Sequence, residues 1–323
     1  MKICLITPAP PGSRKGNRVT AERWARILRS LGHRVIVDQA YRGQPCQLLV
    51  ALHARRSFAS IRRFRRTFPR APMIVALTGT DLYNDIHASR RAHQSLQWAT
   101  RLIVLQPMAL DVLPPSLREK ARVIYQSAVP PNGRYRPGDD EFRVCVLAHL
   151  RPVKDPFRAA MAARRLPSSS RIRIVHLGAA LSQRMEQRAR REMVVNPRYR
   201  WLGDRPHWHA LRILAGSHLL VLSSKMEGGA NVISEAIAAS VPILSSRIPG
   251  SIGLLGPEYP GTFPVGDTGA LAALLHRAET DPAFYRTLKE WGERLKPLVE
   301  PARECQSWKA LLDELFSDEG APS

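Results

Sequence analysis

Short apolar runs that alternate with helical stretches constrain the fold of this chain more than any other feature. The first run, residues 2–6, precedes a proline and glycine loop and then a helix, which we expect Asn17 to cap and Gly32 to end. Further strands are expected at 35–37, 48–52, 73–77, 102–105 and 123–125, with another helix at 57–68. Because strands separated by helices pair in parallel, the pattern predicts a mostly parallel sheet sandwiched by helices.

The same alternation starts again after a polar, proline-bearing segment around residues 127–142, which we interpret as a domain linker. Strands are expected at 144–148, 172–177, 219–222 and 241–244, helices at 156–165, 183–193 and 230–239, and then an all-helical tail. We therefore predict an α/β fold of two Rossmann-like, doubly wound domains that face each other across a cleft. The predicted domains are residues 1–136 and 137–300, and a C-terminal helix at 301–318 is a candidate to complete the first.

The charge is strongly positive and unevenly distributed. Basic residues outnumber acidic ones by 49 to 27 in 323 residues, and residues 1–143 carry a net charge of +16 against +6 for residues 144–323. The first half therefore suits an anionic partner, which could be nucleic acid, a membrane surface or a small phosphorylated substrate. Charge alone does not choose among these three.

Cysteine spacing and apolar run length bear on the compartment. The four cysteines are far apart and form no Cys-x-x-Cys pair, so we expect reduced, mostly buried thiols and a cytoplasmic protein. The apolar run at 3–6 is too short for a signal sequence, and no later run approaches the length of a membrane span. Secretion and membrane spanning are both disfavoured.

Several common catalytic motifs do not occur. The sequence contains no G-x-G-x-x-G, G-x-x-x-x-G-K-[ST], H-E-x-x-H or G-x-S-x-G pattern. The sequence therefore lacks the motifs that usually identify dinucleotide oxidoreductases, P-loop kinases, zincins and α/β-hydrolases.

The most informative segment is residues 219–247, which reads as a buried strand, a glycine-containing turn, a helix and another strand. Glu227 lies on the turn and Glu235 two turns into the helix, on roughly the same side. The residues that open the helix have free N–H groups that favour a phosphate, and a nearby carboxylate suits sugar or ribose hydroxyls. The spacing by itself is weak evidence, because it is explained more simply if Glu235 is a solvated helix carboxylate and Glu227 an ordinary turn residue. The residues that open the helix are Gly229, Ala230, Asn231 and Val232.

This segment resembles the E-x7-E motif of GT-B glycosyltransferases of family 4. The resemblance implies that Glu227 contacts the donor sugar, that Glu235 holds the nucleotide ribose, and that the amides of residues 229–232 bind the diphosphate. Ala230 replaces the second glycine that is usual in the turn of that family.

Further donor residues follow from the same resemblance. The loop AHLRPVKDP places Arg151 and Lys154 where the family carries Arg and Lys against the donor phosphates. The resemblance also assigns Gly16, in the N-terminal glycine loop, and Arg205, in the loop at 201–206, to donor binding. Both cations of the AHLRPVKDP loop are also compatible with an ordinary basic surface loop.

The N-terminal loop carries a dense positive cluster. It ends at a helix start and adds Arg14, Lys15 and Arg18 beside Asn17, more charge than a sugar diphosphate needs. We assign these four residues to binding a second anion, the acceptor, although a solvated basic loop is the alternative.

One departure from the family bears on mechanism. Family members commonly place a histidine in a T-x-H-D-like stretch near the reacting sugar, whereas this chain has Thr80 there, followed by Asp81. We assign both residues to acceptor binding. An alcohol acceptor would gain from a general base, but an ionised nucleophile would not. The missing histidine and the extra cationic charge therefore suggest an anionic nucleophile.

Segments spread over nearly the whole chain resemble one branch of these enzymes, the selenosugar synthases of selenoneine biosynthesis. They are GNRVTAERWARILRSLGHRV, LTGTDLY, VLQPMALDVLP, AHLRPVKDP and EGGANVISEA. The resemblance implies that selenophosphate is joined to the anomeric carbon of a UDP-sugar, UDP-N-acetylglucosamine or UDP-glucose, giving a selenosugar and UDP. It further implies no cofactor and no metal, no nucleic-acid partner, no stable membrane association, and a handover to the next pathway enzyme.

The sequence is also compatible with two other functional hypotheses. One is ordinary sugar transfer to a lipid-linked or hydroxyl acceptor, with the basic first domain resting on an anionic membrane. The other is a basic nucleic-acid-binding protein, which a pI near 11.0 permits. The nucleic-acid-binding hypothesis gives Glu227 and Glu235 no role.

Overall fold

The chain forms two compact units, each built around its own parallel sheet. The computed structural model describes residues 1–13 and 15–317. The first unit contains residues 1–126, 227–230 and the segment from Pro301 onward, and the second contains residues 127–226 and 231–300. The first unit gives way to the second after Gln126, ten residues before the boundary expected from the sequence, so residues 127–136 of the proline-bearing segment belong to the second unit.

The sheet of the first unit has the strand order β2-β1-β3-β4-β5-β6, and every neighbouring pair is parallel. Its strands are β1 (Lys2–Ile6), β2 (Arg34–Asp38), β3 (Leu48–Leu52), β4 (Met73–Ala76), β5 (Arg101–Val104) and β6 (Ala121–Val123). The helices are α1 (Gly16–Ser30), α2 (Phe58–Thr67), α3 (Ile86–Ala88), α4 (Arg90–Trp98), α5 (Ala109–Val112), α6 (Pro115–Arg118) and α14 (Pro301–Ser317), with a π-helix, η1 (Asp81–Asp85).

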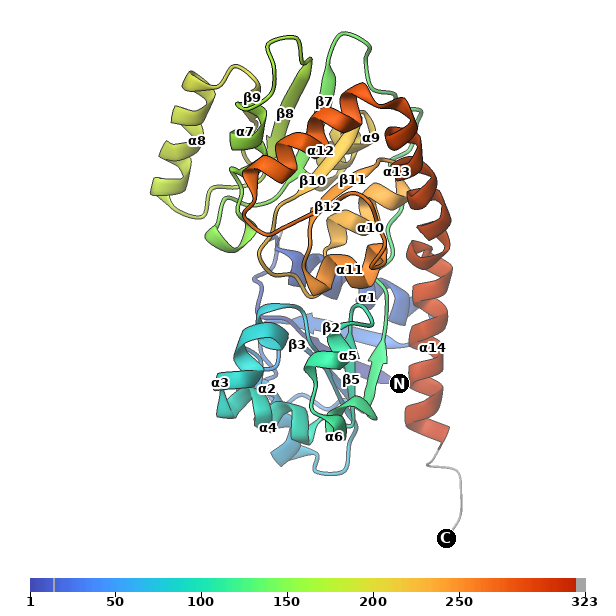
Figure 1. Ribbon diagram of the computed structural model, residues 1–323. Helices are drawn as coiled ribbons and strands as arrows, with labels where there is room; N and C mark the ends of the chain where they lie inside the picture. Colours follow the sequence, from blue (N-terminus) through green and yellow to red (C-terminus); the bar gives the residue numbers. More distant parts are fainter. Residues whose placement is uncertain (14, 318–323) are drawn as a thin grey trace. The chain divides into compact units, whose positions relative to one another are not determined.

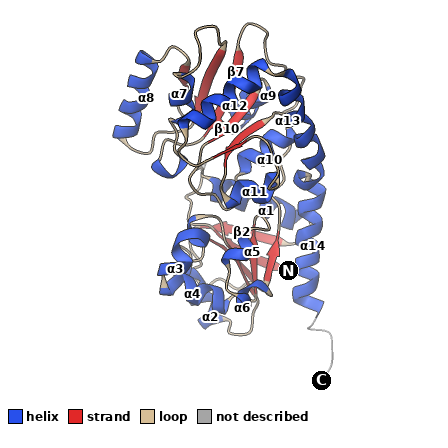
Figure 2. Cartoon of the chain, viewed as in Figure 1, coloured by secondary structure: helices blue, strands red, loops and turns tan. Residues whose placement is uncertain are grey.

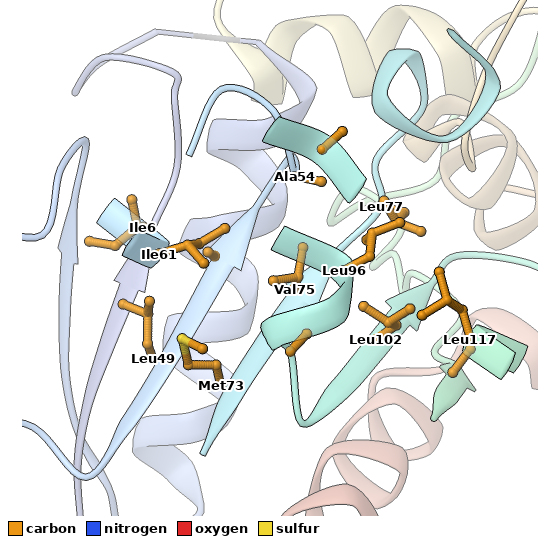
Figure 3. Close-up of a cluster of buried hydrophobic side chains, with 14 of the residues drawn as sticks. Ile6, Leu49, Ala54, Ile61, Met73, Val75, Leu77, Leu96, Leu102 and Leu117 are labelled. Carbon is orange, nitrogen blue, oxygen red and sulfur yellow. The ribbon is translucent and has the colours of Figure 1, made fainter. Parts of the chain in front are cut away.

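Alternate residues of these strands bury opposite faces of the sheet, as the two-residue period of a strand requires. On one face, Leu49, Met73 and Val75 pack with Ile61 of α2 and Leu96 of α4, and Figure 3 shows these side chains gathered in one cluster. The other face is covered by α1 and α14. Both faces are apolar because a parallel sheet is normally covered on both sides.

The C-terminal helix α14 is an integral part of the first unit. Its Trp308 is fully buried and meets Trp24 of α1 edge to face, with 5.0 Å between the ring centroids. Glu304, also on α14, is 1% exposed and accepts hydrogen bonds from Trp24 Nε1 at 2.8 Å and from Arg23 Nε at 2.9 Å. In Figure 1 this helix runs beside the N-terminal sheet.

The sheet of the second unit has the order β12-β11-β10-β7-β8-β9 and is also parallel. Its strands are β7 (Phe142–Leu147), β8 (Ile172–Leu177), β9 (Tyr199–Trp201), β10 (Leu219–Leu222), β11 (Ile243–Ser246) and β12 (Thr262–Phe263). The helices are α7 (Arg158–Ala163), α8 (Gln183–Val195), α9 (His207–Ala215), α10 (Asn231–Ala238), α11 (Pro249–Leu255), α12 (Thr268–Thr280) and α13 (Pro282–Leu295), with 3-10 helices η2 (Pro152–Lys154) and η3 (Lys296–Val299).

The predicted architecture of two doubly wound α/β units is confirmed, and Figure 2 shows helices on both faces of each sheet. Some elements differ from the expectation. Strand β6 ends at Val123 instead of starting there, and the short strand β12 interrupts the tail that was expected to be all helical. Asn17 does not cap α1, because the helix already begins at Gly16 and the capping position is Lys15.

Two further expectations concern thiols and membrane spans. The four cysteines are unpaired thiols; Cys4, Cys46 and Cys145 are buried and Cys305 is partly so. Within residues 1–13 and 15–317, no helix combines the length and the apolar character that crossing a bilayer would need.

Candidate active site

The turn that carries Glu227 belongs to the first unit and is closely packed within it through its glycines. A Cβ atom on Gly228 would lie 2.6 Å from the carbonyl carbon of Thr78 and 2.7 Å from the nitrogen of Gly79. A Cβ atom on Gly229 would lie 2.6 Å from the Cβ atom of Leu105. Glycine is therefore required at both positions by close approach. These contacts lie within the first unit, between the turn and residues that follow β4 and β5, and the chain enters the second unit again at Asn231.

A buried glutamine also holds this turn. Gln126 is 3% exposed, and its Nε2 donates to the carbonyl oxygen of Gly229 at 2.7 Å. Its Oε1 accepts from Thr20 Oγ1 at 2.6 Å and from Arg23 Nη2 at 2.8 Å, both on α1. The orientation of the amide is therefore set by three groups, and these hydrogen bonds hold the turn in place.

The helix that follows the turn begins as the sequence predicted, within one residue. Helix α10 starts at Asn231, and Ala230 is the last residue of the turn. Asn231 is partly exposed and Val232 is 9% exposed. The first turn of such a helix leaves backbone N–H groups without partners inside the helix, which is a favourable place for a phosphate.

Glu235 has a partner that the sequence did not indicate. Its Oε1 lies 2.8 Å from Nε2 of His207, the first residue of α9, and the carboxylate side chain is 13% exposed. Because the imidazole is 54% exposed, this contact contributes little to stability. Its effect is to hold the carboxylate in one direction. Arg205 is exposed in the loop before α9, two residues from the histidine.

The loop with Arg151 and Lys154 is tied to the start of the Glu227 turn. Ser223 Oγ donates to the carbonyl oxygens of Lys154 and Asp155, at 3.3 and 2.9 Å, and Lys225 N donates to Val153 O at 2.8 Å. The Arg151 side chain has a buried Nε with no hydrogen-bond partner among the described residues. A buried guanidinium nitrogen without a partner is costly, and an anionic ligand would satisfy it.

The N-terminal cluster is only partly available to a ligand. Lys15 and Gly16 are exposed at the start of α1, and Asn17 is partly exposed. Arg18 Nε pairs with Glu22 at 2.6 Å, while Arg18 Nη1 is buried without a partner among the described residues. Arg14, which was assigned to the same cluster, lies outside the described residues.

Asp81 is used inside the protein. It is 0% exposed; its Oδ1 accepts from the backbone nitrogens of Thr78 and Gly79, each at 2.9 Å, and its Oδ2 accepts from Ala54 N at 3.1 Å. The carboxylate therefore shapes the loop after β4, and its burial leaves it out of reach of an acceptor, contrary to the assignment made from the sequence.

Thr80 is partly exposed in that loop, and its hydroxyl lies 3.1 Å from Nε2 of His53. His53 follows β3 directly and is 2% exposed. No sequence motif pointed to this histidine, nor to His207 or Gln126. The position of His53 immediately after the buried run of β3 could have indicated a place in the site, because side chains at the carboxyl ends of parallel strands gather at one edge of the sheet.

Comparison with solved structures defines the fold class. Sucrose-phosphate synthase from Thermosynechococcus elongatus is similar over 98% of this chain and 99% of its own, with 18% identity and a TM-score of 0.78. HepE of Anabaena, solved in complex with UDP-glucose, is similar over 97% of this chain and 100% of its own, with 16% identity and a TM-score of 0.78. The pneumococcal O-GlcNAc transferase GtfA, solved with UDP and GlcNAc, aligns with 92% of this chain and 60% of its own, with 12% identity and a TM-score of 0.67. The fold is GT-B.

The family follows from the sequence of the second unit. The family described as "Glycosyl transferases group 1" matches residues 133–295, which is half of the chain. The chain belongs to this family. No curated protein matches it.

Proposed function

We propose that this protein transfers a sugar from a UDP-sugar to selenophosphate and so forms a carbon–selenium bond. The observation that carries the glycosyltransferase part is the turn from Glu227 to Ala230, held by Gly228, Gly229 and Gln126 directly before the start of α10. Family membership supports the reaction class. UDP as the nucleotide is supported by the similarity to HepE, which was solved with UDP-glucose.

In this proposal the second unit binds the donor. Glu235 accepts hydrogen bonds from the ribose hydroxyls, the N-terminus of α10 receives the diphosphate, and Arg205 with its loop borders the uracil. Arg151 and Lys154 stabilise the charge that develops on the diphosphate as it leaves. Glu227 contacts the sugar that is transferred. The cations take the role of a metal ion, so the proposal includes neither a metal nor another cofactor.

The first unit binds the acceptor in this proposal. Lys15, Asn17 and Arg18 lie in the first turn of α1 or directly before it, and Thr80 lies in the loop after β4. Two observations favour an anion over an alcohol here. Arg18 Nη1 is buried without a partner among the described residues. A threonine, which is not a useful general base, stands where related enzymes carry histidine.

The proposed reaction balances without an oxidant or a reductant. Selenium forms a bond to the anomeric carbon, the bond from that carbon to the UDP oxygen breaks, and UDP leaves with the electron pair. The first product is a sugar that carries a selenophosphoryl group. Water then cleaves the selenium–phosphorus bond, which releases inorganic phosphate and leaves the selenosugar. Because the nucleophile is already ionised, orientation and stabilisation of the leaving group supply most of the rate enhancement.

The test is anaerobic incubation of the full-length protein with selenophosphate and either UDP-N-acetylglucosamine or UDP-glucose, followed by mass spectrometry. We expect UDP and a sugar product with the selenium isotope pattern, formed with one of the two donors. UDP-sugar binding without any selenium-containing product would refute selenophosphate as the acceptor and would favour a hydroxyl or lipid-linked acceptor.

The ribose assignment gives a separate prediction. Glu235→Gln keeps the size of the side chain but removes its charge, and hydrogen bonds to a charged group are about twice as strong as neutral ones. We expect the KM for the UDP-sugar to rise about tenfold with a smaller effect on kcat. Glu290→Gln, at an exposed glutamate of α13, is the control and should change neither constant. An unchanged donor KM in Glu235→Gln would contradict the assignment.

A further inference from the structure

A buried histidine lies behind the Thr80 hydroxyl, and the proposed reaction as described so far gives it no role. Strands β3 and β4 are neighbours in the first sheet, so residues that follow them meet at its carboxyl edge. His53 follows β3 in the left-handed region, with φ of 73°, and is 2% exposed. A non-glycine residue held in this conformation and buried is maintained by its surroundings.

The hydrogen bonds around the imidazole define which nitrogen carries the proton. The backbone N–H of Arg56 donates to His53 Nδ1 at 3.4 Å, so Nδ1 is an acceptor. The Asp81 Oδ2 atom is 3.9 Å from Nδ1, beyond hydrogen-bond distance, and is occupied by Ala54 N. Burial lowers the pKa of His53 below its ordinary value, against the effect of the Asp81 carboxylate, so the ring is neutral near pH 7. The proton of the neutral ring is therefore on Nε2.

This tautomer fixes the role of the threonine. With the proton on Nε2, the imidazole donates to Thr80 Oγ1 across 3.1 Å. The threonine oxygen is then an acceptor in that bond, and its own hydrogen is left to donate elsewhere. Among the described residues, the Thr80 hydroxyl has no hydrogen-bond partner other than His53. The residue is partly exposed, so a ligand can reach it.

We propose that His53 is a positioning residue that holds the Thr80 hydroxyl as a hydrogen-bond donor to a phosphoryl oxygen of the acceptor. The inference rests on the proposed function and specifies the acceptor class as one with anionic oxygens. A donor held in this way matches an anion, because every oxygen of a phosphoryl group accepts hydrogen bonds. It does not serve as a base for an alcohol, since the threonine oxygen is already occupied by the imidazole N–H.

The experiment measures binding of inorganic phosphate to the full-length protein saturated with UDP, by titration calorimetry. Thr80→Val removes the hydroxyl at nearly constant shape, and we expect the Kd for phosphate to rise about tenfold. Thr80→Ser retains the hydroxyl and should stay within about twofold of the wild type. Thr67→Val, at an exposed threonine that ends α2, is the matched control and should have no effect.

A double-mutant cycle distinguishes positioning from independent binding. His53→Leu should weaken phosphate binding about as much as Thr80→Val, and the double variant should bind no more weakly than Thr80→Val alone. The Kd for UDP should stay within about twofold of the wild type throughout, which also reports intact folding. Three results would each overturn the inference: unchanged phosphate affinity in Thr80→Val, additive losses in the double variant, or no phosphate binding by the wild type.

The outcome is separable from that of the proposed function. If the wild type forms no selenium product but phosphate affinity depends on Thr80 as expected, selenophosphate is the wrong acceptor and the phosphoryl site stands. If a selenium product forms and Thr80→Val binds phosphate normally, the proposed function stands and the role given to Thr80 and His53 is wrong.

Discussion

Replacing Lys154 with alanine is expected to lower kcat by about two to three orders of magnitude, the effect seen when one group that stabilises developing negative charge is removed. The ammonium group is carried by a loop that Ser223 holds through two hydrogen bonds, to the carbonyl oxygens of Lys154 and Asp155. These bonds involve the backbone, so the loop should keep its position in the variant. The loss should therefore fall on turnover and much less on the fold.

The measurement is initial-rate kinetics with saturating UDP-sugar, which separates kcat from donor binding. Lys289→Ala, at an exposed lysine of α13 in the same unit, is the control and should behave as the wild type. Lys154→Arg should recover only part of the loss, because a guanidinium places its charge differently from an ammonium group. Turnover of Lys154→Ala close to that of the wild type would refute the role of leaving-group stabiliser.

The sequence predicted the bounds of two strands of the second sheet to the residue. Residues 172–177 and 219–222 were expected as strands, and β8 and β10 have these same bounds. Both are apolar or alternating runs bounded by polar residues, which is the clearest signal of a strand in a doubly wound sheet. Strand β9 was missed because it has three residues, with Arg200 exposed in its centre.

The candidate site was predicted only where its residues are close in sequence. The motif from Glu227 to Glu235 is a local pattern, and so is the start of α10. The partners of Thr80 and Glu235 lie in other elements: His53 is 27 residues from Thr80, and His207 is 28 residues from Glu235. The order of the strands in a sheet determines which of the residues that follow them come together, and hydrophobic periodicity carries no information about that order.

The glycine at position 228 gives the second large expected effect. Gly228→Ala would place a methyl group 2.6 Å from the carbonyl carbon of Thr78 and 2.7 Å from Gly79 N. Both are backbone atoms, which cannot rotate away as a side chain can, so the turn or the loop after β4 must move. Such a shift displaces Glu227 on one side and Thr80 on the other. A displacement near 1 Å at reacting groups costs about 100-fold in rate, and we expect kcat/KM to fall by about that factor.

The matched control is Gly138→Ala, because a Cβ atom at Gly138 would meet nothing within 4 Å. This variant should have wild-type kcat/KM, whereas Gly228→Ala should lose activity while thermal melting still shows a cooperative transition. Because the atoms nearest to a Cβ atom at Gly228 are backbone atoms of the loop after β4, the loss should affect both substrates, in contrast to the donor-specific effect expected for Glu235→Gln. A folded Gly228→Ala protein with kcat/KM within about twofold of the wild type would show that the turn tolerates displacement, and that its close packing on Thr78 and Gly79 does not position the reacting groups.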